Sequence, residues 1–211
     1  MSNSKIPLLI VVSAPSGAGK STLCDRLLAD RPDMAYSVSC TTRAPRGTER
    51  DGRDYFFLDE DEFERRAAEG QFLEQAVVHG FRYGTLRETV TCSLARGAGV
   101  LMDIDVQGAA QIRAAARGAR PDDPIRRGFL DVFIAPPSLE ALLRRLEERA
   151  TDSPETIARR LRNAEAELAR KPEFAHVVVN DDLETAYGEF RSLIESVELD
   201  ARSVNGEALR I

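Results

Sequence analysis

Short apolar runs alternate along this chain with segments whose apolar residues recur at helical spacing. Residues 6–13 form a continuous apolar run between turn-forming residues, and similar runs occupy residues 99–103, 130–135 and 176–180. Such runs predict strands that are buried on both faces, as in a parallel sheet. Residues 20–29 directly follow the first run and predict a helix.

Further helices are predicted between and after these strands. Residues 106–116 have a helical pattern, and three apolar stripes mark three more helices. The stripes are Leu139, Leu142, Leu143 and Leu146; Ile157, Leu161 and Leu168; and Leu183, Tyr187, Phe190, Ile194 and Val197. Strands that alternate with helices predict βαβ units, and therefore an α/β fold with a mostly parallel, doubly wound sheet.

Three segments depart from this alternation. Residues 36–96 are rich in aromatic residues and hold shorter, more polar strand-like pieces at 54–58 and 72–78, which predicts an inserted α+β lobe with antiparallel pairing. Residues 118–128 carry Gly, Pro and charges and predict a surface loop, and residues 150–154 predict a polar tip between two helices.

Composition narrows the class of protein. The chain has 211 residues, of which 43% are hydrophobic and 30% charged, as in one globular domain. A net charge of −6 argues against a nucleic-acid-coating surface but allows a small anion held by a few local arginines. Three scattered cysteines form no CxxC pair, and the apolar run near the start is too short to span a membrane. We therefore expect a cytoplasmic protein without nucleic-acid or membrane partners.

A glycine-rich turn joins the first predicted strand to the first predicted helix, which is the context of a phosphate-binding P-loop. Glycines let successive backbone N–H groups point at phosphate oxygens, Lys20 would bridge the β- and γ-phosphates of ATP, and Ser21 would place its hydroxyl on Mg²⁺. Ala14 stands where the strict pattern has glycine. A turn that caps an ordinary helix is the alternative. The predicted ATP-binding residues of the turn are Ala14, Pro15, Ser16, Gly17, Ala18, Gly19, Lys20, Ser21 and Thr22.

Asp103 ends the strand predicted at 99–103, and Asp105 follows it. Carboxylates at the carboxyl end of a parallel strand face the ligand crevice, so Asp103 is a candidate for orienting Mg²⁺ through water or for accepting hydrogen bonds from a substrate. Asp105 fits the same role and equally the N-cap of the following helix.

Arg43 and Arg46 lie three residues apart in a segment that Pro45 keeps out of a regular helix. Two guanidinium groups at this spacing can grip one phosphate. Solvated surface arginines are the alternative.

Seven separated motifs resemble those of the guanylate kinase family in order and approximate spacing, from about residue 6 to residue 200. They lie at residues 13–22, 39–46, 52–55, 72–74, 83–85, 101–108 and 177–182. The alanine at position 14 also occurs in that family. The resemblance implies a P-loop core (1–35, 97–137 and 171–211), a GMP-binding lobe (36–96) and a helical lid (about 138–170).

The same resemblance implies an activity. It predicts Mg²⁺-dependent phosphoryl transfer from ATP to GMP, giving ADP and GDP, in purine nucleotide metabolism and GMP recycling. It leaves open whether dGMP is a second substrate, whether the protein is a monomer or a homo-oligomer, and what residues 117–128 contribute.

For the GMP phosphate, the resemblance implies that Arg43 and Arg46 bind it, assisted by the phenols of Tyr55 and Tyr83. Packing of the two rings in a core, with each hydroxyl at the edge, is an equal alternative.

For the guanine base, the resemblance implies that Glu74 and Asp103 accept hydrogen bonds from N1–H and the 2-amino group, while Ser39 and Thr85 contact O6 and N7. A carboxylate only accepts hydrogen bonds, so it favours guanine over adenine, whose N1 is also an acceptor.

For ATP, the resemblance implies that Arg145, Arg149 and Arg160 belong to the lid and stabilise the transferred phosphoryl group. Asn180 would lie near the adenine, although an asparagine that simply ends a strand fits as well. Two other functions are alternatives: a non-catalytic protein-binding module, which the presence of Lys20 disfavours, and a ribose phosphate kinase, which Glu74 disfavours.

Overall fold

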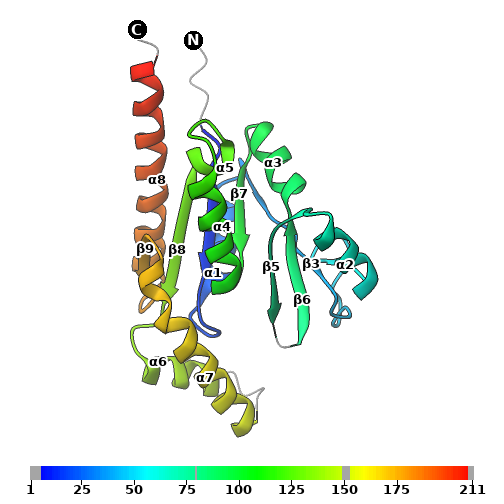
Figure 1. Ribbon diagram of the computed structural model, residues 1–211. Coiled ribbons are helices and arrows are strands. Elements are labelled where there is room, and N and C mark those ends of the chain that lie inside the picture. Colours follow the sequence, from blue (N-terminus) through cyan, green and yellow to red (C-terminus); the bar gives the residue numbers. More distant parts are fainter. Residues whose placement is uncertain (1–5, 79, 149–152, 209–211) are drawn as a thin grey trace.

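A five-stranded parallel sheet forms the centre of the protein (Figure 1). The computed structural model describes residues 6–78, 80–148 and 153–208. The strand order is β2-β7-β1-β8-β9, and every pair runs parallel. The strands are β1 (Leu9–Ser13), β2 (Met34–Tyr36), β7 (Gly99–Asp103), β8 (Phe129–Ala135) and β9 (His176–Val179). The predicted doubly wound α/β fold is confirmed.

Burial on both faces explains the continuous apolar strands. Successive residues of β1 point to opposite faces, so Ile10 and Val12 join one apolar cluster while Leu9 and Val11 join another. Helices α1 and α8 cover the first cluster, and α3, α4 and α5 cover the second. These helices are α1 (Lys20–Asp30), α3 (Arg87–Ala95), α4 (Val106–Gly118), α5 (Pro124–Arg127) and α8 (Leu183–Ala208).

A smaller four-stranded sheet with the order β4-β3-β6-β5 lies beside the central sheet (Figure 1). Its strands are β3 (Cys40–Thr41), β4 (Phe56–Phe57), β5 (Phe72–Val78) and β6 (Phe81–Leu86). The predicted antiparallel pairing holds for β5–β6 and β3–β6, whereas β3 and β4 run parallel because the long connection between them returns the chain in the same direction. Helix α2 (Glu60–Ala68) packs on this sheet through Phe63, which stacks on Phe72.

Helices α6 (Leu139–Glu148) and α7 (Pro154–Ala169) form a helical hairpin below the central sheet in Figure 1. Leu142 and Leu146 are fully buried against Ala164 of α7. Leu139 is 38% exposed, so the buried stripe of α6 begins one turn later than the sequence pattern predicted. A short 3-10 helix, η1 (Lys171–Glu173), leads from α7 to β9.

The segment 118–128 is more ordered than the predicted surface loop. It contains the single-turn helix α5, because Asp123 caps the backbone N–H of Ile125 and Pro124 fixes the first helical position. The Ile125 side chain is buried in the core, so the segment is anchored from within. Across the described ranges, no helix is both long enough and apolar enough to cross a membrane.

Candidate active site

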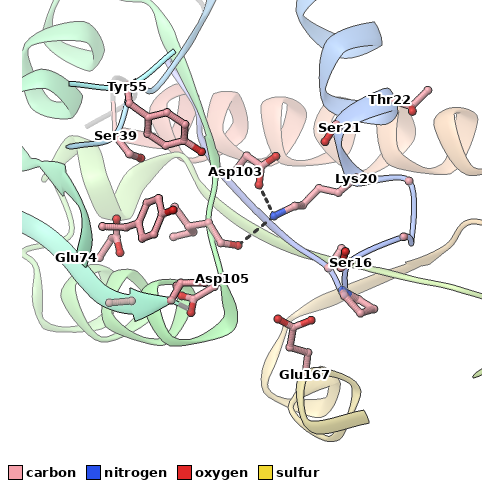
Figure 2. Close-up of a pocket in the computed structure, with 18 residues that line it drawn as sticks. Ser16, Lys20, Ser21, Thr22, Ser39, Tyr55, Glu74, Asp103, Asp105 and Glu167 are labelled. Atoms are coloured by element: carbon pink, nitrogen blue, oxygen red, sulfur yellow. Dashed lines mark hydrogen bonds and ion pairs between the residues drawn. The ribbon is translucent and has the colours of Figure 1, made fainter. Parts of the chain in front are cut away.

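A pocket of about 400 Å³ opens where the carboxyl ends of β1 and β7 face the small sheet (Figure 2). One wall is the P-loop, residues 14–22, and the opposite wall is made by β5 and β6. Of the predicted ATP- and GMP-binding residues, thirteen line it: Ala14, Pro15, Ser16, Gly17, Gly19, Lys20, Ser21, Thr22, Ser39, Tyr55, Glu74, Tyr83 and Asp103. Residues predicted from segments far apart in sequence thus meet in one cavity.

The P-loop takes its shape from two glycines in the left-handed region. Gly17 has φ +94° and Gly19 has φ +89°, a conformation that side chains with a Cβ rarely adopt. A Cβ at Gly17 would also approach Leu142 of α6 to 3.0 Å. The turn therefore depends on glycine both for its backbone path and for the close packing of the helical hairpin.

Lys20 reaches from the P-loop to the end of β7. Its ammonium forms an ion pair with Asp103 and donates a 3.4 Å hydrogen bond to the carbonyl of Ile104 (Figure 2). The ion pair therefore joins Lys20, which is predicted to bind ATP, to Asp103, which is predicted to bind GMP.

A chain of hydrogen bonds crosses the small sheet. A register shift between Phe72 and Glu74 places Glu74 opposite Thr85, and the Thr85 hydroxyl donates to the Glu74 carboxylate at 2.7 Å. The hydroxyls of Ser39 and Thr85 lie 3.2 Å apart. Three predicted guanine-binding side chains from different strands and loops therefore form one connected network of polar contacts.

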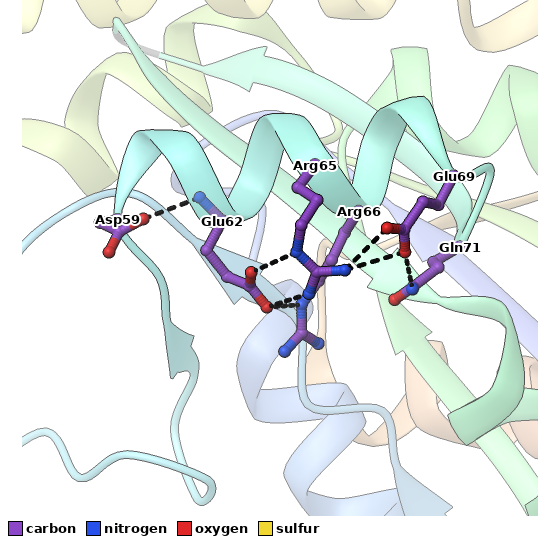
Figure 3. A network of polar contacts seen from close by, with 6 residues as sticks. All are labelled: Asp59, Glu62, Arg65, Arg66, Glu69 and Gln71. Carbon is purple, nitrogen blue, oxygen red and sulfur yellow. Dashed lines mark hydrogen bonds and ion pairs between the residues drawn. The ribbon is translucent and has the colours of Figure 1, made fainter.

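Two glutamates of the same region have opposite electrostatic environments. Glu74 is only 4% exposed, and burial raises its pKa to about 7, although the Thr85 hydrogen bond works in the other direction. Glu62 of α2 lies among arginines at the surface, where hydrogen bonds from Arg65 and Arg66 lower its pKa to about 2 (Figure 3). Of these two carboxylates, only the buried one has a pKa near neutral.

The predicted phosphate-binding groups of the small sheet also meet. The Nε of Arg43 donates to the Tyr83 hydroxyl at 3.2 Å, and its guanidinium lies 5.3 Å from the Tyr55 ring centre. The two tyrosine rings contact edge to face, with centroids 5.9 Å apart. Arg43 is buried, so it is not one of the solvated arginines that the alternative interpretation required.

Glu49 is a partner of this cluster that the sequence interpretation missed. Its carboxylate accepts two hydrogen bonds from the Arg43 guanidinium, at 2.9 and 3.0 Å, and a third from the backbone N–H of Arg46 at 2.7 Å. The Arg46 side chain itself is exposed. An acidic residue three positions after Arg46, in a turn already assigned to anion binding, was the available signal.

A second pocket, of about 380 Å³, lies on the other side of the P-loop and is lined by Arg145 and Asn180 together with Gly17, Gly19 and Thr22. Arg145 donates to the carbonyl of Asp181 at 3.2 Å. The Asn180 side chain is buried, and its Nδ2 donates to the P-loop carbonyl of Ala18 at 2.8 Å. Asn180 is therefore more than the end of a strand, because it supports the phosphate-binding turn.

The remaining predicted residues are distributed as follows. Arg160 is half-buried on α7 and lines neither pocket, and Arg149 lies outside the described residues. Asp105 is the N-cap of α4, since it accepts the backbone N–H of Gly108 at 2.8 Å, and it also lines the main pocket. The N-cap interpretation of Asp105 is therefore confirmed, while its role toward Mg²⁺ or a substrate stays a prediction.

Glu167 was not predicted, yet it reaches the main pocket from α7 (Figure 2). It follows Arg160 by seven residues and so lies on the same face of the helix. A charged residue at that spacing beside the apolar stripe was a weak signal for a pocket-facing position.

The donor set is compatible with Mg²⁺. Ser21 and Asp103 line the same pocket, and Mg²⁺ typically takes one or two protein oxygens and completes its shell with water and substrate phosphates. Among the residues that the structure describes, no group of three or more His, Cys, Asp or Glu side chains forms a closed metal cage.

A P-loop at the carboxyl edge of a parallel sheet, facing a second sheet that carries a buried carboxylate, defines a P-loop kinase of small phosphorylated substrates. Residues 7–197 match the guanylate kinase family model. The chain belongs to the guanylate kinase family, whose reaction is the ATP-dependent phosphorylation of GMP.

Individual relatives agree with this assignment. The chain is 46% identical over 210 residues to a guanylate kinase from Symbiobacterium thermophilum, covering 99% of this chain and 94% of that one. It is 50% identical over 193 residues to one from Anaeromyxobacter dehalogenans, covering 91% and 81%. The crystal structure of guanylate kinase from Anaplasma phagocytophilum superimposes with a TM-score of 0.70 at 30% identity, covering 92% of this chain and 87% of that one.

Proposed function

We propose that this chain binds ATP on the P-loop and GMP against the small sheet, and transfers the γ-phosphoryl group between them with Mg²⁺. The observation that carries the proposal is the position of the buried Glu74, which Thr85 holds by a hydrogen bond and which lines the same pocket as Lys20 and the P-loop. A buried carboxylate that faces a phosphate cradle suits a substrate with two N–H donors at one end and a phosphate at the other.

In this reaction a phosphate oxygen of GMP attacks the γ-phosphorus of ATP. One O–P bond forms as the bond between the γ-phosphorus and the β–γ bridging oxygen breaks, and ADP leaves. The protein needs no general base, because the phosphate monoester is largely a dianion near neutral pH. Its task is to align the two phosphates and to balance their charge.

The ATP side would be held by the P-loop N–H groups and by Lys20. Lys20 is poised for this role, because its ammonium already lies at the pocket surface between the P-loop and Asp103. Arg145, beside the second pocket, would bind the phosphate chain from α6, and Arg149 and Arg160 would act from the same hairpin. Asn180, which lines that pocket, would contact the adenine.

The GMP side would be held at both ends. Arg43, Arg46, Tyr55 and Tyr83 would bind the phosphate, because three of the four are already in contact around the Arg43 guanidinium. The base would meet a separate set of acceptors and hydroxyls, namely Glu74, Asp103, Ser39 and Thr85.

The Ser21 hydroxyl would hold Mg²⁺ directly, and Asp103 would hold it through water. When bound, the ion supplies positive charge that offsets the charge of the phosphate oxygens. Lys20, now paired with Asp103, would turn to the phosphates of ATP.

The direct test is to mix the protein with ATP and Mg²⁺ and to measure ADP release with GMP, dGMP, AMP, CMP and UMP. We expect the highest kcat/KM with GMP, and dGMP reports whether the ribose 2′-hydroxyl is needed. Faster release with AMP or UMP than with GMP would contradict the guanine assignment.

A further inference from the structure

A carboxylate from the helical hairpin sits on the P-loop. Glu167, in the last turn of α7, lines the main pocket together with Ser16, whose backbone N–H favours the ionised carboxylate. Figure 2 shows its side chain pointing at the loop from below, close to Ser16. Among the family motifs quoted above, none includes this residue.

On balance, the surroundings of Glu167 disfavour the ionised form of its carboxylate. Lys20 favours the ionised carboxylate, whereas Asp105 and partial burial disfavour it, and burial is the largest effect. Asp103 and Glu74 line the same pocket. Its charged lining residues are therefore four carboxylates and one ammonium, in a cavity that must accept two polyanionic nucleotides.

The N–H of Ser16 belongs to the set of backbone donors that a P-loop directs at phosphate oxygens. A carboxylate that this N–H favours in its ionised form occupies a place where a phosphate oxygen would be stabilised as well. Within one pocket an anionic side chain and an anionic phosphate repel each other, so the two compete for the same donors.

We propose that Glu167 is an internal anion that competes with the phosphates of ATP for the P-loop and so sets the affinity of the pocket for ATP. The inference rests on the proposed function, because it assumes that ATP is the P-loop ligand. It predicts that α7 must release the Glu167 contact, or the carboxylate must lose its charge, when ATP binds.

The test is the dissociation constant for MgATP, measured by isothermal titration calorimetry without GMP at pH 8.0. At this pH most of the carboxylate is ionised, because the pKa of Glu167 is raised only to about 7. Glu167→Gln keeps the size of the side chain and removes its charge. We expect it to bind MgATP about fivefold more tightly than the wild type, as removal of one nearby like charge implies.

The matched control is Glu165→Gln. Glu165 lies two residues earlier on α7 and is exposed, and it lines neither pocket, so its removal changes the net charge by the same amount without reaching the P-loop. We expect its affinity for MgATP to equal that of the wild type. Affinity for GMP alone, measured in the same way, should be unchanged in both variants.

Glu167→Ala removes the whole carboxylate arm and gives a second measurement of the same quantity. Tighter binding by both Glu167 variants supports the competition. Unchanged or weaker binding overturns it, and weaker binding would mean that Glu167 holds the loop in its binding shape. A wild-type protein that phosphorylates no GMP and binds no MgATP would instead contradict the proposed function.

Discussion

The P-loop and the small sheet face each other across one pocket, but they are built for recognition in different ways. The P-loop wall is contiguous in sequence, offers backbone N–H groups and one lysine, and depends on Gly17 and Gly19 for its shape. The opposite wall includes Ser39 and Glu74, which come from separate parts of the chain, present their side chains to the pocket and are joined behind it by the buried Thr85.

The P-loop wall is suited to binding negative charge, whereas the opposite wall is suited to recognising a base. Backbone donors bind any phosphate, so the P-loop wall can supply affinity and catalysis without selecting a nucleoside. A buried carboxylate with a fixed hydrogen-bond partner selects through the pattern of donors that it can accept, because a mismatched buried polar group is costly. We therefore expect substitutions on the two walls to affect different kinetic constants.

The largest effect is expected for Lys20→Ala. Loss of the ammonium removes charge stabilisation at the transferred phosphoryl group, and kcat should fall by about 10³-fold. GMP affinity, followed by intrinsic tyrosine fluorescence, should stay within a few-fold of the wild type. Lys171→Ala, an exposed lysine in η1, is the control and should keep full turnover. A Lys20 variant with near-normal kcat would remove Lys20 from the chemical step.

The next largest effect is expected for Glu74→Gln. The amide offers one acceptor and one donor where the carboxylate offers two acceptors, so kcat/KM for GMP should fall by about 10²-fold. The ratio of kcat/KM for GMP to that for AMP should fall with it. Glu69→Gln is the control, since Glu69 lies on the surface in the α2 network of Figure 3. An unchanged ratio would show that the base is selected elsewhere.

A smaller effect is expected from pH. Binding of the guanine N–H groups needs the ionised Glu74, whose pKa in the free protein is about 7. The affinity is therefore nearly complete at about pH 8, half lost at pH 7, and falls by about a further fivefold between pH 7 and pH 6. Guanosine is the suitable ligand for calorimetry, because it carries no phosphate that titrates in this range. A flat profile would contradict the assignment, and Glu74→Gln should give one.

The smallest effect is expected for Thr85→Val. The hydroxyl lowers the pKa of Glu74, so its removal should move the inflection of the guanosine profile to higher pH, by about one unit. At pH 9 the loss of affinity should be no more than a few-fold. A profile that keeps its inflection near pH 7 would mean that Thr85 does not act through Glu74.

The sequence predicted the P-loop wall better than the small-sheet wall for physical reasons. A strand buried on both faces leaves a continuous apolar run, and the P-loop is a local motif whose glycines and lysine follow directly. Strand β3 has two residues and β2 has three, which is too short for an apolar period to appear, whereas the two residues of β4 lie within the piece predicted at 54–58. The small sheet was therefore located as a region, while its parallel β3–β4 pair was not predicted.

Contacts between segments far apart in the sequence could not be predicted from it either. The bond from Asn180 to Ala18 spans 162 residues of sequence, and Glu167 meets Ser16 only because the helical hairpin folds under the P-loop. The register shift at β5 that turns Glu74 toward Thr85 likewise has no local signature. The family resemblance supplied roles for Glu74 and Asn180, but not these partners.

The position of β1 in the middle of the central sheet has a consequence for synthesis of the chain. Leu9 pairs with Val100 on one side and with Phe129 on the other, so β1 leaves the ribosome before either of its neighbours and has none until β2 and the small sheet have been made and β7 has emerged. At about 5–20 residues per second, that interval lasts roughly 5 to 20 s. During this interval, the apolar side chains of β1 depend on α1, or on a chaperone, to shield them from water.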